Sequence, residues 1–162
     1  MKGVGRIKFL ADEMNGDLAK WLRIMGFDCR YLVGRDMDNK LLDICLKEGR
    51  VLLTGDKELY RRARSLGIPC VLTLENSKEE KLRKVIKTFN LAQFVGKEYR
   101  CSLCNTRLVR VRVDEVDIEL PKYVKERFQY IWYCSKCRKA YWEGSHWNNI
   151  LSFLRKVLGE GL

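Results

Sequence analysis

Hydrophobic and polar positions along the first 96 residues alternate between two patterns. Each short apolar run of strand length is followed by a segment in which apolar residues recur every three or four positions, as on one face of a helix. The predicted strands are residues 7–11, 29–33, 51–54 and 70–74. The predicted helices are residues 15–25, 38–48, 56–66 and a last one that begins at Ser77. This alternation, with short connections, predicts an α/β fold in which helices cover both faces of a parallel sheet.

The apolar stripes of the first two helices predict which side chains pack on the sheet. They are Leu18, Trp21, Leu22 and Met25 in the first helix, and Leu41, Leu42, Cys45 and Leu46 in the second. The single cysteines Cys29, Cys45 and Cys70 lie among apolar residues, so we expect them to behave as small buried hydrophobic residues.

Two cysteine pairs change the picture after residue 96. Gly96 and the charged stretch 97–100 mark the predicted boundary between a domain of residues 1–96 and one of residues 97–162. The pairs Cys101-x-x-Cys104 and Cys134-x-x-Cys137, with 29 residues between them, present four thiolates. Four thiolates complete the tetrahedral coordination of Zn²⁺ and leave no position for a substrate, so the predicted zinc is structural. The intervening segments 108–113 and 128–133 are strand-like, which predicts a zinc ribbon.

A terminal helix is predicted after the second cysteine pair, with Ser145 as its N-cap. Its apolar stripe consists of Trp147, Ile150, Leu151, Leu154 and Leu158. His146, the one histidine of the chain, has two interpretations. It contacts a phosphate or transfers a proton, or it is a residue at the start of the helix that forms a local hydrogen bond or packs between the domains.

Acidic residues follow three of the predicted strands. Asp12 and Glu13 follow the first, Asp36 and Asp38 the second, and Asp56 the third. Ligands of open parallel sheets bind outside the carboxyl ends of the strands, so the fold brings these acids to one edge. Carboxylate oxygens are suitable ligands for Mg²⁺ or Mn²⁺, and such an ion can activate water against a phosphodiester.

A second interpretation of these acids is helix capping. Asp and Ser residues lead the N-cap preferences, and Asp38 and Asp56 both stand where a helix begins. Remaining acids of this region are interpreted as solvated helix faces: Asp17, Asp28, Asp43, Glu48 and Glu58.

The chain carries 32 Lys and Arg against 21 Asp and Glu, a formal charge of +11. This excess favours a polyanionic partner, and basic residues around an acidic metal pocket are the charge layout of a nuclease. No apolar run approaches the ~20 residues of a membrane span, and the N-terminus has no signal-peptide pattern. We therefore expect a cytoplasmic protein with a polyanionic partner, no membrane association and no small-molecule cofactor.

Several motifs together resemble one known family. The first motif consists of residues 9–14 together with residues 18–28, and the second of residues 51–56. The third is the segment Tyr141-Trp142-x-Gly144-Ser145-His146-Trp147, which follows the second cysteine pair. The chain resembles, over about residues 7–158, the C-terminal ribonuclease domain of the Mut-seven exonuclease and its stand-alone prokaryotic relatives. That family joins a PIN-like nuclease to a zinc ribbon. Asp17 and Gly55 depart from its pattern, since basic residues are usual at both positions.

The resemblance implies metal-dependent hydrolysis of RNA phosphodiester bonds. The PIN-like acids map onto Asp12, Asp38 and Asp56, with Asp36 as an alternative to Asp38 and Glu13 as a weaker candidate. These residues would hold Mg²⁺ or Mn²⁺. Candidate RNA contacts are Lys20, Arg23, Lys57, Arg61, Arg62, Lys136, Arg138, Lys139 and His146.

Two other functions compete with the ribonuclease. One is a non-catalytic RNA-binding or adaptor protein, whose ribbon would use Tyr130, Trp132 and Tyr133 for stacking and nearby basic residues for phosphates. The other is a phosphoacceptor domain with Asp56 as the acceptor. That alternative lacks the lysine expected after a fifth strand, because a helix and the cysteine region follow the fourth.

Overall fold

The computed structural model describes residues 7–159, which fall into two compact units. The first unit runs up to Asn105 and the second begins at Thr106. The division after residue 96 that the sequence suggested, into domains of residues 1–96 and 97–162, stays a prediction. Each unit is described separately below.

A four-stranded parallel sheet forms the centre of the first unit. The strands are β1 (Lys8–Ala11), β2 (Asp28–Tyr31), β3 (Arg50–Thr54) and β4 (Cys70–Leu72), in the order β2-β1-β3-β4. The connecting helices are α1 (Gly16–Ile24), α2 (Asp38–Glu48), α3 (Lys57–Ser65) and α4 (Lys78–Thr88). Two short 3₁₀ helices, η2 (Glu13–Asn15) and η3 (Ala92–Phe94), complete the unit. The predicted α/β fold with a parallel sheet is confirmed.

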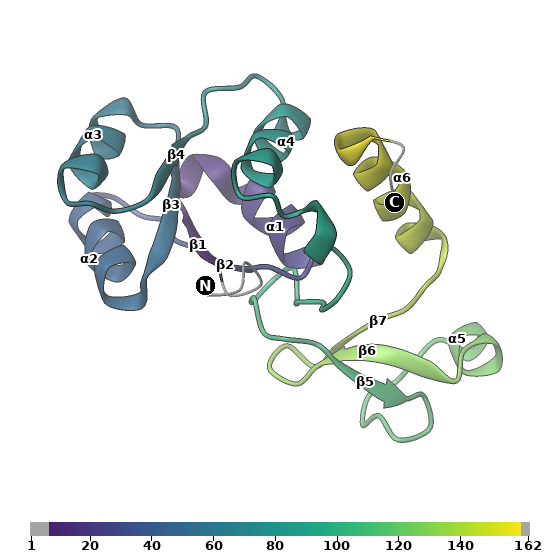
Figure 1. Ribbon diagram of the computed structural model, residues 1–162. Helices are drawn as coiled ribbons and strands as arrows, with labels where there is room; N and C mark the ends of the chain where they lie inside the picture. The colour runs from purple at the N-terminus through teal and green to yellow at the C-terminus, as the bar shows by residue number, and fades with distance from the viewer. Residues whose placement is uncertain (1–6, 160–162) are drawn as a thin grey trace. The chain divides into compact units, whose positions relative to one another are not determined.

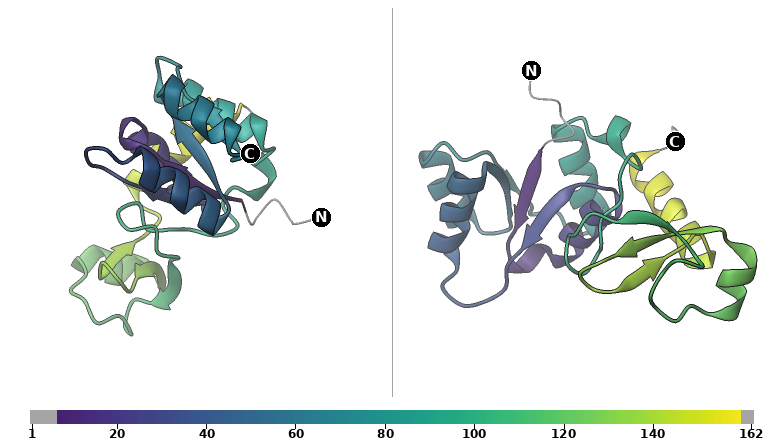
Figure 2. Two further views of the ribbon diagram at one scale, coloured as in Figure 1. Left: turned by 90° about the vertical axis from the view of Figure 1, so that its left-hand side faces the viewer. Right: turned by 90° about the horizontal axis from the view of Figure 1, so that it is seen from below.

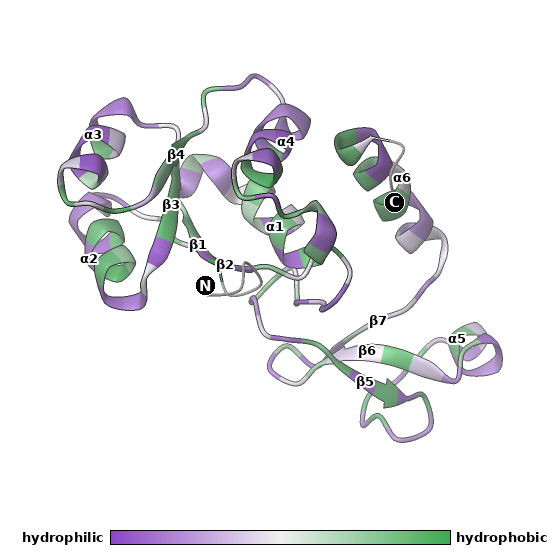
Figure 3. Cartoon of the chain, in the orientation of Figure 1, coloured by the Kyte–Doolittle hydropathy of each residue, from purple (hydrophilic) through white to green (hydrophobic). Residues whose placement is uncertain are grey.

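Helices cover both faces of this sheet. Figures 1 and 2 show α2 and α3 on one side and α1 and α4 on the other. On the α2/α3 side, Leu10 and Leu52 of the sheet pack in one cluster with Leu41 and Leu59 of the helices. On the opposite side, the ring of Phe9 meets that of Phe89 edge-on, with centroids 5.6 Å apart. The hydropathy colouring of Figure 3 shows apolar strands between helices whose surfaces are partly polar.

Two sequence-based interpretations of side chains in this unit were wrong. Leu46 is 55% exposed because only Leu41, Leu42 and Cys45 of helix α2 are buried against the sheet. Asp28 and Glu48 are not solvated acids of helix faces. Both carboxylates contact the guanidinium of the buried Arg50, at 2.7 Å and 2.6 Å, and form an ion-pair network at the amino ends of the strands.

The second unit is built on a three-stranded antiparallel sheet. Its strands are β5 (Val109–Arg112), β6 (Tyr130–Cys134) and β7 (Lys139–Tyr141), and β6 is central. Between β5 and β6 lies helix α5 (Lys122–Arg127), and after β7 comes helix α6 (Ser145–Leu158). Leu120, Val124 and Ile131 form a small core, surrounded by partly buried apolar residues that include Phe128 and Trp142.

The terminal helix differs slightly from its prediction. Gly144 occupies the N-cap position and Ser145 is the first helical residue, so the expected Ser145 cap is corrected. The buried residues of α6 are Ile150, Leu154 and Val157. None of the helices within residues 7–159 is both long and apolar enough to cross a membrane.

Candidate active site and cysteine cluster

The carboxyl ends of β1 and β3 lie side by side in the middle of the sheet. The chain leaves β1 toward β2 on one flank, and after β2 it crosses back to β3 on the other flank. Such a reversal of strand order is a topological switch point, where ligands of open α/β sheets bind. The residue that follows β1 is Asp12, and Thr54, Gly55 and Asp56 follow from the end of β3.

Asp12 is the most buried of the predicted acids. Its side chain is held from two sides and the residue is only 6% exposed. Oδ1 accepts a hydrogen bond from Asn15 Nδ2 at 2.7 Å. Oδ2 accepts one from Thr54 Oγ1 at 2.6 Å and one from the Gly55 N–H at 3.1 Å. All three donors are neutral, and Asp12 has no cationic partner within residues 7–159.

A buried polar network continues from Asp12 to the next strand. Asn15 is 1% exposed, and its Nδ2 also donates to the Leu53 carbonyl at 3.3 Å. Its Oδ1 accepts a hydrogen bond from Thr73 Oγ1 at 3.0 Å. Asn15, Thr54 and Thr73 therefore fix the orientation of the Asp12 carboxylate. Sequence reasoning missed these three residues, although each is a polar residue close to the carboxyl end of a strand.

Asp56 is exposed and caps helix α3. Its Oδ1 accepts hydrogen bonds from the backbone N–H groups of Glu58 and Leu59, at 2.8 and 3.0 Å. The capping interpretation is thus confirmed for Asp56. Its own N–H donates to Thr54 Oγ1 at 3.0 Å, so one hydroxyl connects it to Asp12. Oδ2 of Asp56 accepts no hydrogen bond from the part of the chain that is described.

The acids after β2 are arranged differently. Asp38 is the first residue of α2, and Met37 occupies the N-cap position of that helix. The side chain of Met37 forms no capping hydrogen bond. The capping interpretation was therefore wrong for Asp38. Its carboxylate lies 3.6 Å from Arg62 of α3, which also donates to Asn39. Asp36 is exposed and has a left-handed backbone, with φ of 52°.

Glu13 belongs to η2, and its side chain is exposed. Within residues 7–159, the four cysteines are the one group of three or more His, Cys, Asp or Glu residues that gathers closely enough to hold a metal ion. The structure therefore links Asp12 and Asp56 through Thr54 but does not gather three acids around one point. The assignment of Asp12, Asp38 and Asp56 as a ligand set stays a prediction.

Arg23, predicted to contact RNA, takes a structural position instead. The residue is 8% exposed. Its Nε donates to the Cys29 carbonyl at 2.7 Å, and its Nη1 donates to the carbonyls of Ser102 and Leu103 at 3.0 and 3.3 Å. Because its guanidinium donates to these backbone carbonyls, Arg23 is removed from the candidate RNA contacts.

Asn105 completes the edge of the sheet next to Arg23. Its Oδ1 accepts a hydrogen bond from the N–H of Cys29 at 3.0 Å, and its Nδ2 donates to Asp28 at 2.8 Å. Strand β2 is at the edge of the sheet, and edge strands expose unpaired backbone groups. Arg23 and Asn105 satisfy the outward N–H and C=O of Cys29 and attach the segment around the first cysteine pair to β2.

The other predicted RNA contacts lie at or near the surface. Arg62 is half-buried beside Asp38, and Arg138 donates to the Asp117 carbonyl at 2.8 Å. Arg61 pairs with Glu58 at 3.3 Å. The exposed residues of the set are Lys20, Lys57, Arg61, Lys136, Arg138, Lys139 and His146.

The four cysteines predicted to bind zinc do come together. Their Sγ atoms all lie within 4.8 Å of one another, and sulfurs bonded to one tetrahedral zinc at about 2.3 Å are about 3.8 Å apart. The Cys137 N–H donates to Cys134 Sγ at 3.4 Å. Cys101 and Cys134 are buried, whereas Cys137 is exposed. The group is positioned to hold a metal ion, and an all-thiolate set suits zinc.

The fold and the cysteine cluster define a class of protein: a parallel α/β unit combined with a four-cysteine group that is positioned to hold a metal ion. The chain belongs to the Mut7-C RNAse domain family, whose model matches residues 7–154. It is also similar to a human (Homo sapiens) protein named exonuclease mut-7 homolog, with 26% identity over 101 residues. That match covers 60% of this chain and 12% of the human protein. No solved structure matches the chain. The family supports a nuclease-like role.

Proposed function

We propose that this chain is a metal-dependent ribonuclease that hydrolyses RNA phosphodiester bonds at the carboxyl ends of β1 and β3. The observation that carries the proposal is the environment of Asp12. A carboxylate buried to this degree is normally paired with a cation or coordinates a metal, because isolated buried charge is costly. Only neutral donors contact Asp12 in the described chain, so a divalent cation would supply the missing positive charge.

The donor set fits a hard cation. A carboxylate has about four lone-pair sites, and three hydrogen bonds to Asp12 leave one of them for an ion. Asp56 would contribute Oδ2, which its capping bonds leave open. We propose Asp38 as the third acid, with Asp36 as the alternative and Glu13 as a weaker candidate. When bound, Mg²⁺ or Mn²⁺ would activate a water and stabilise charge on the leaving oxygen.

The residues of this chain would orient the reaction. Thr54 holds Asp12 through its hydroxyl proton and accepts the Asp56 N–H, so the two acids keep a fixed relation. Arg62 would keep Asp38 at the edge of the sheet. Lys20 and Lys57 are exposed and make no ion pair within residues 7–159, which leaves both ammonium groups for phosphate contacts. A zinc held by the four cysteines would be structural, since no coordination position remains open.

The test is cleavage of labelled single-stranded and structured RNA with added Mn²⁺, by the full chain and by three variants. Asp12→Asn and Asp56→Asn are expected to lose at least 100-fold in rate. Asp43→Asn is the matched control, because Asp43 is an exposed acid of α2 paired with Lys47. Cleavage that needs no divalent cation, or full activity of the Asp12→Asn and Asp56→Asn double variant, contradicts the proposal. RNA binding without cleavage would favour the adaptor function instead.

A further inference from the structure

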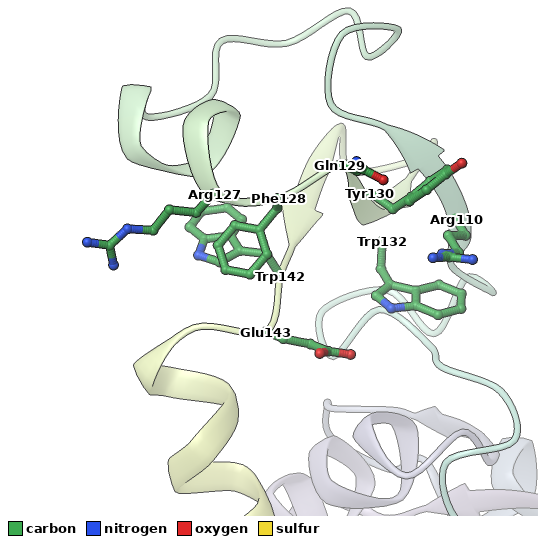
Figure 4. Close-up of a pocket in the computed structure, with 8 residues that line it drawn as sticks. All are labelled: Arg110, Arg127, Phe128, Gln129, Tyr130, Trp132, Trp142 and Glu143. Carbon is green, nitrogen blue, oxygen red and sulfur yellow. The ribbon is translucent and has the colours of Figure 1, made fainter.

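The second unit contains an aromatic pocket that the proposed hydrolytic site does not use. It has a volume of about 300 Å³, near the lower end of the range for small-molecule sites. Figure 4 shows Phe128 and Trp142 on one side, Tyr130 and Trp132 on the other, and Arg127 directed outward. The residues that line it are Arg110, Arg127, Phe128, Gln129, Tyr130, Trp132, Trp142 and Glu143.

The aromatic walls of the pocket are only partly used by the core of the unit. Phe128 and Trp142 border the cluster around Ile131 and remain half-buried. Tyr130 is 42% exposed and Trp132 is half-buried. An aromatic surface of this kind can stack on any nucleobase, since every base has a π-face.

The polar groups around the pocket have unused hydrogen-bonding capacity. The guanidinium of Arg110 lies over the Tyr130 ring, 4.0 Å from the ring centroid. Because this is a stacking contact, the N–H donors of Arg110 stay open. Within residues 7–159, the side chains of Arg110, Arg127, Gln129 and Glu143 form no ion pair or hydrogen bond with protein groups. The pocket therefore offers two cations for phosphate, an amide that both donates and accepts, and a carboxylate that accepts.

We infer that this pocket binds one unpaired nucleobase of a single-stranded RNA. The base stacks on Trp132, the polar edge meets Gln129 or Glu143, and Arg110 and Arg127 contact the flanking phosphates. Charge favours this occupant, since residues 106–159 hold eleven basic and six acidic residues. A paired helix keeps its bases stacked internally, so the pocket selects single strands. The inference rests on the proposed function only in taking RNA as the ligand.

The test measures binding without cleavage, so that its result is independent of hydrolysis. The full chain is titrated against a fluorescein-labelled twelve-nucleotide single-stranded RNA, without added Mg²⁺ or Mn²⁺, and anisotropy is recorded. Trp132→Ala is expected to weaken binding roughly 5- to 150-fold, the range measured for one stacked base. Trp132→Phe keeps an aromatic face and is expected to restore most of the affinity. Arg110→Ala is expected to weaken binding and to reduce its salt dependence.

The matched control is Val109→Ala. Val109 is 50% exposed and is the neighbour of Arg110 on β5, and alternation along a strand places its side chain on the face of the sheet opposite Arg110 and Trp132. This variant should bind within about twofold of the wild type, a difference of under half a kcal/mol. A double-stranded RNA of the same sequence should bind the wild type and Trp132→Ala equally. Far-ultraviolet circular dichroism confirms that each variant is folded.

Three results would overturn the inference. The first is a Trp132→Ala variant that is folded and binds single-stranded RNA as the wild type does. The second is an equal loss of affinity for single- and double-stranded RNA, which would indicate phosphate contacts alone. The third is a wild type that binds no single-stranded RNA but binds a proline-rich peptide, which would make the pocket a protein-binding surface. Cleavage of RNA by a wild type with any of these results would leave the proposed ribonuclease function intact.

Discussion

Replacing Thr54 by Val removes one hydroxyl from the centre of the candidate site and preserves the shape of the side chain. Thr54 is fully buried, and its hydroxyl has two partners. It donates to Asp12 Oδ2 at 2.6 Å and accepts the Asp56 N–H at 3.0 Å. The first is a charge-assisted bond, and loss of the second leaves a partly buried donor without an acceptor. We expect Thr54→Val to lower the free energy of unfolding by about 2–4 kcal/mol.

The assay is urea unfolding followed by circular dichroism, with Thr54→Ser as the matched control. Ser keeps the hydroxyl and deletes one methyl group, which costs about 1 kcal/mol in a packed core. Thr54→Ser should therefore be more stable than Thr54→Val and should retain RNA cleavage, while Thr54→Val should lose at least tenfold in rate. If Thr54→Val proves as stable and as active as Thr54→Ser, the hydroxyl does not organise the site.

Two further predictions concern charge and the cysteines. Burial alone would raise the pKa of Asp28, but hydrogen bonds from Arg50 and Asn105 outweigh it and hold that pKa below its usual value. Hydrogen bonds from Arg50 and Arg30 likewise lower the pKa of Glu48. Their stabilisation is complete at neutral pH and is lost as the pH falls through the lowered pKa values. Arg50→Met should lower the free energy of unfolding by about 3 kcal/mol at pH 7 and by less at pH 3. The urea unfolding midpoints at both pH values measure this, and a midpoint shift as large at pH 3 as at pH 7 argues against it. Burial raises the pKa of the Cys29, Cys45 and Cys70 thiols to about 12, 11 and 12, so iodoacetamide at pH 8 should leave them unmodified in the folded chain. A chelator that removes the metal ion from the cysteine cluster should make its four thiols reactive toward iodoacetamide, and mass spectrometry would detect their modification. These thiols are Cys101, Cys104, Cys134 and Cys137.

The strands and helices of the first unit could be predicted because their signal is local. The periods of apolar residues locate β1 to β4 and α1 to α4 within a few residues, and the strand–helix alternation implies the parallel sheet. Because the carboxyl ends of parallel strands lie at one edge of the sheet, Asp12 and Asp56 can be placed at neighbouring strand ends before any contact is known. The cysteine spacing predicts the cluster for the same reason, since each pair is a local turn.

What the sequence could not reveal depends on long-range contacts. Asn15 reaches Thr73, 58 residues away, and Asn105 reaches Cys29, 76 residues away. No local pattern distinguishes such a residue from a solvated one. The same limitation applies to Arg23, an arginine within an amphipathic helix whose burial follows from carbonyl groups about 80 residues further along the chain.

The missed elements of the second unit are short. Strand β7 has three residues and helix α5 has six, too few to show a period. Pro121 directly before α5 was the available signal, because proline favours the first positions of helices.

Anomalous diffraction from crystals of the full chain soaked in Mn²⁺ tests the central claim most directly. We expect a manganese peak within about 2.2 Å of an Asp12 carboxylate oxygen, with Asp56 Oδ2 near the same ion. The same map would decide between Asp36 and Asp38 as the third ligand. If the protein cleaves RNA with Mn²⁺ in solution and its soaked crystals show no manganese at Asp12, the proposed metal site is contradicted.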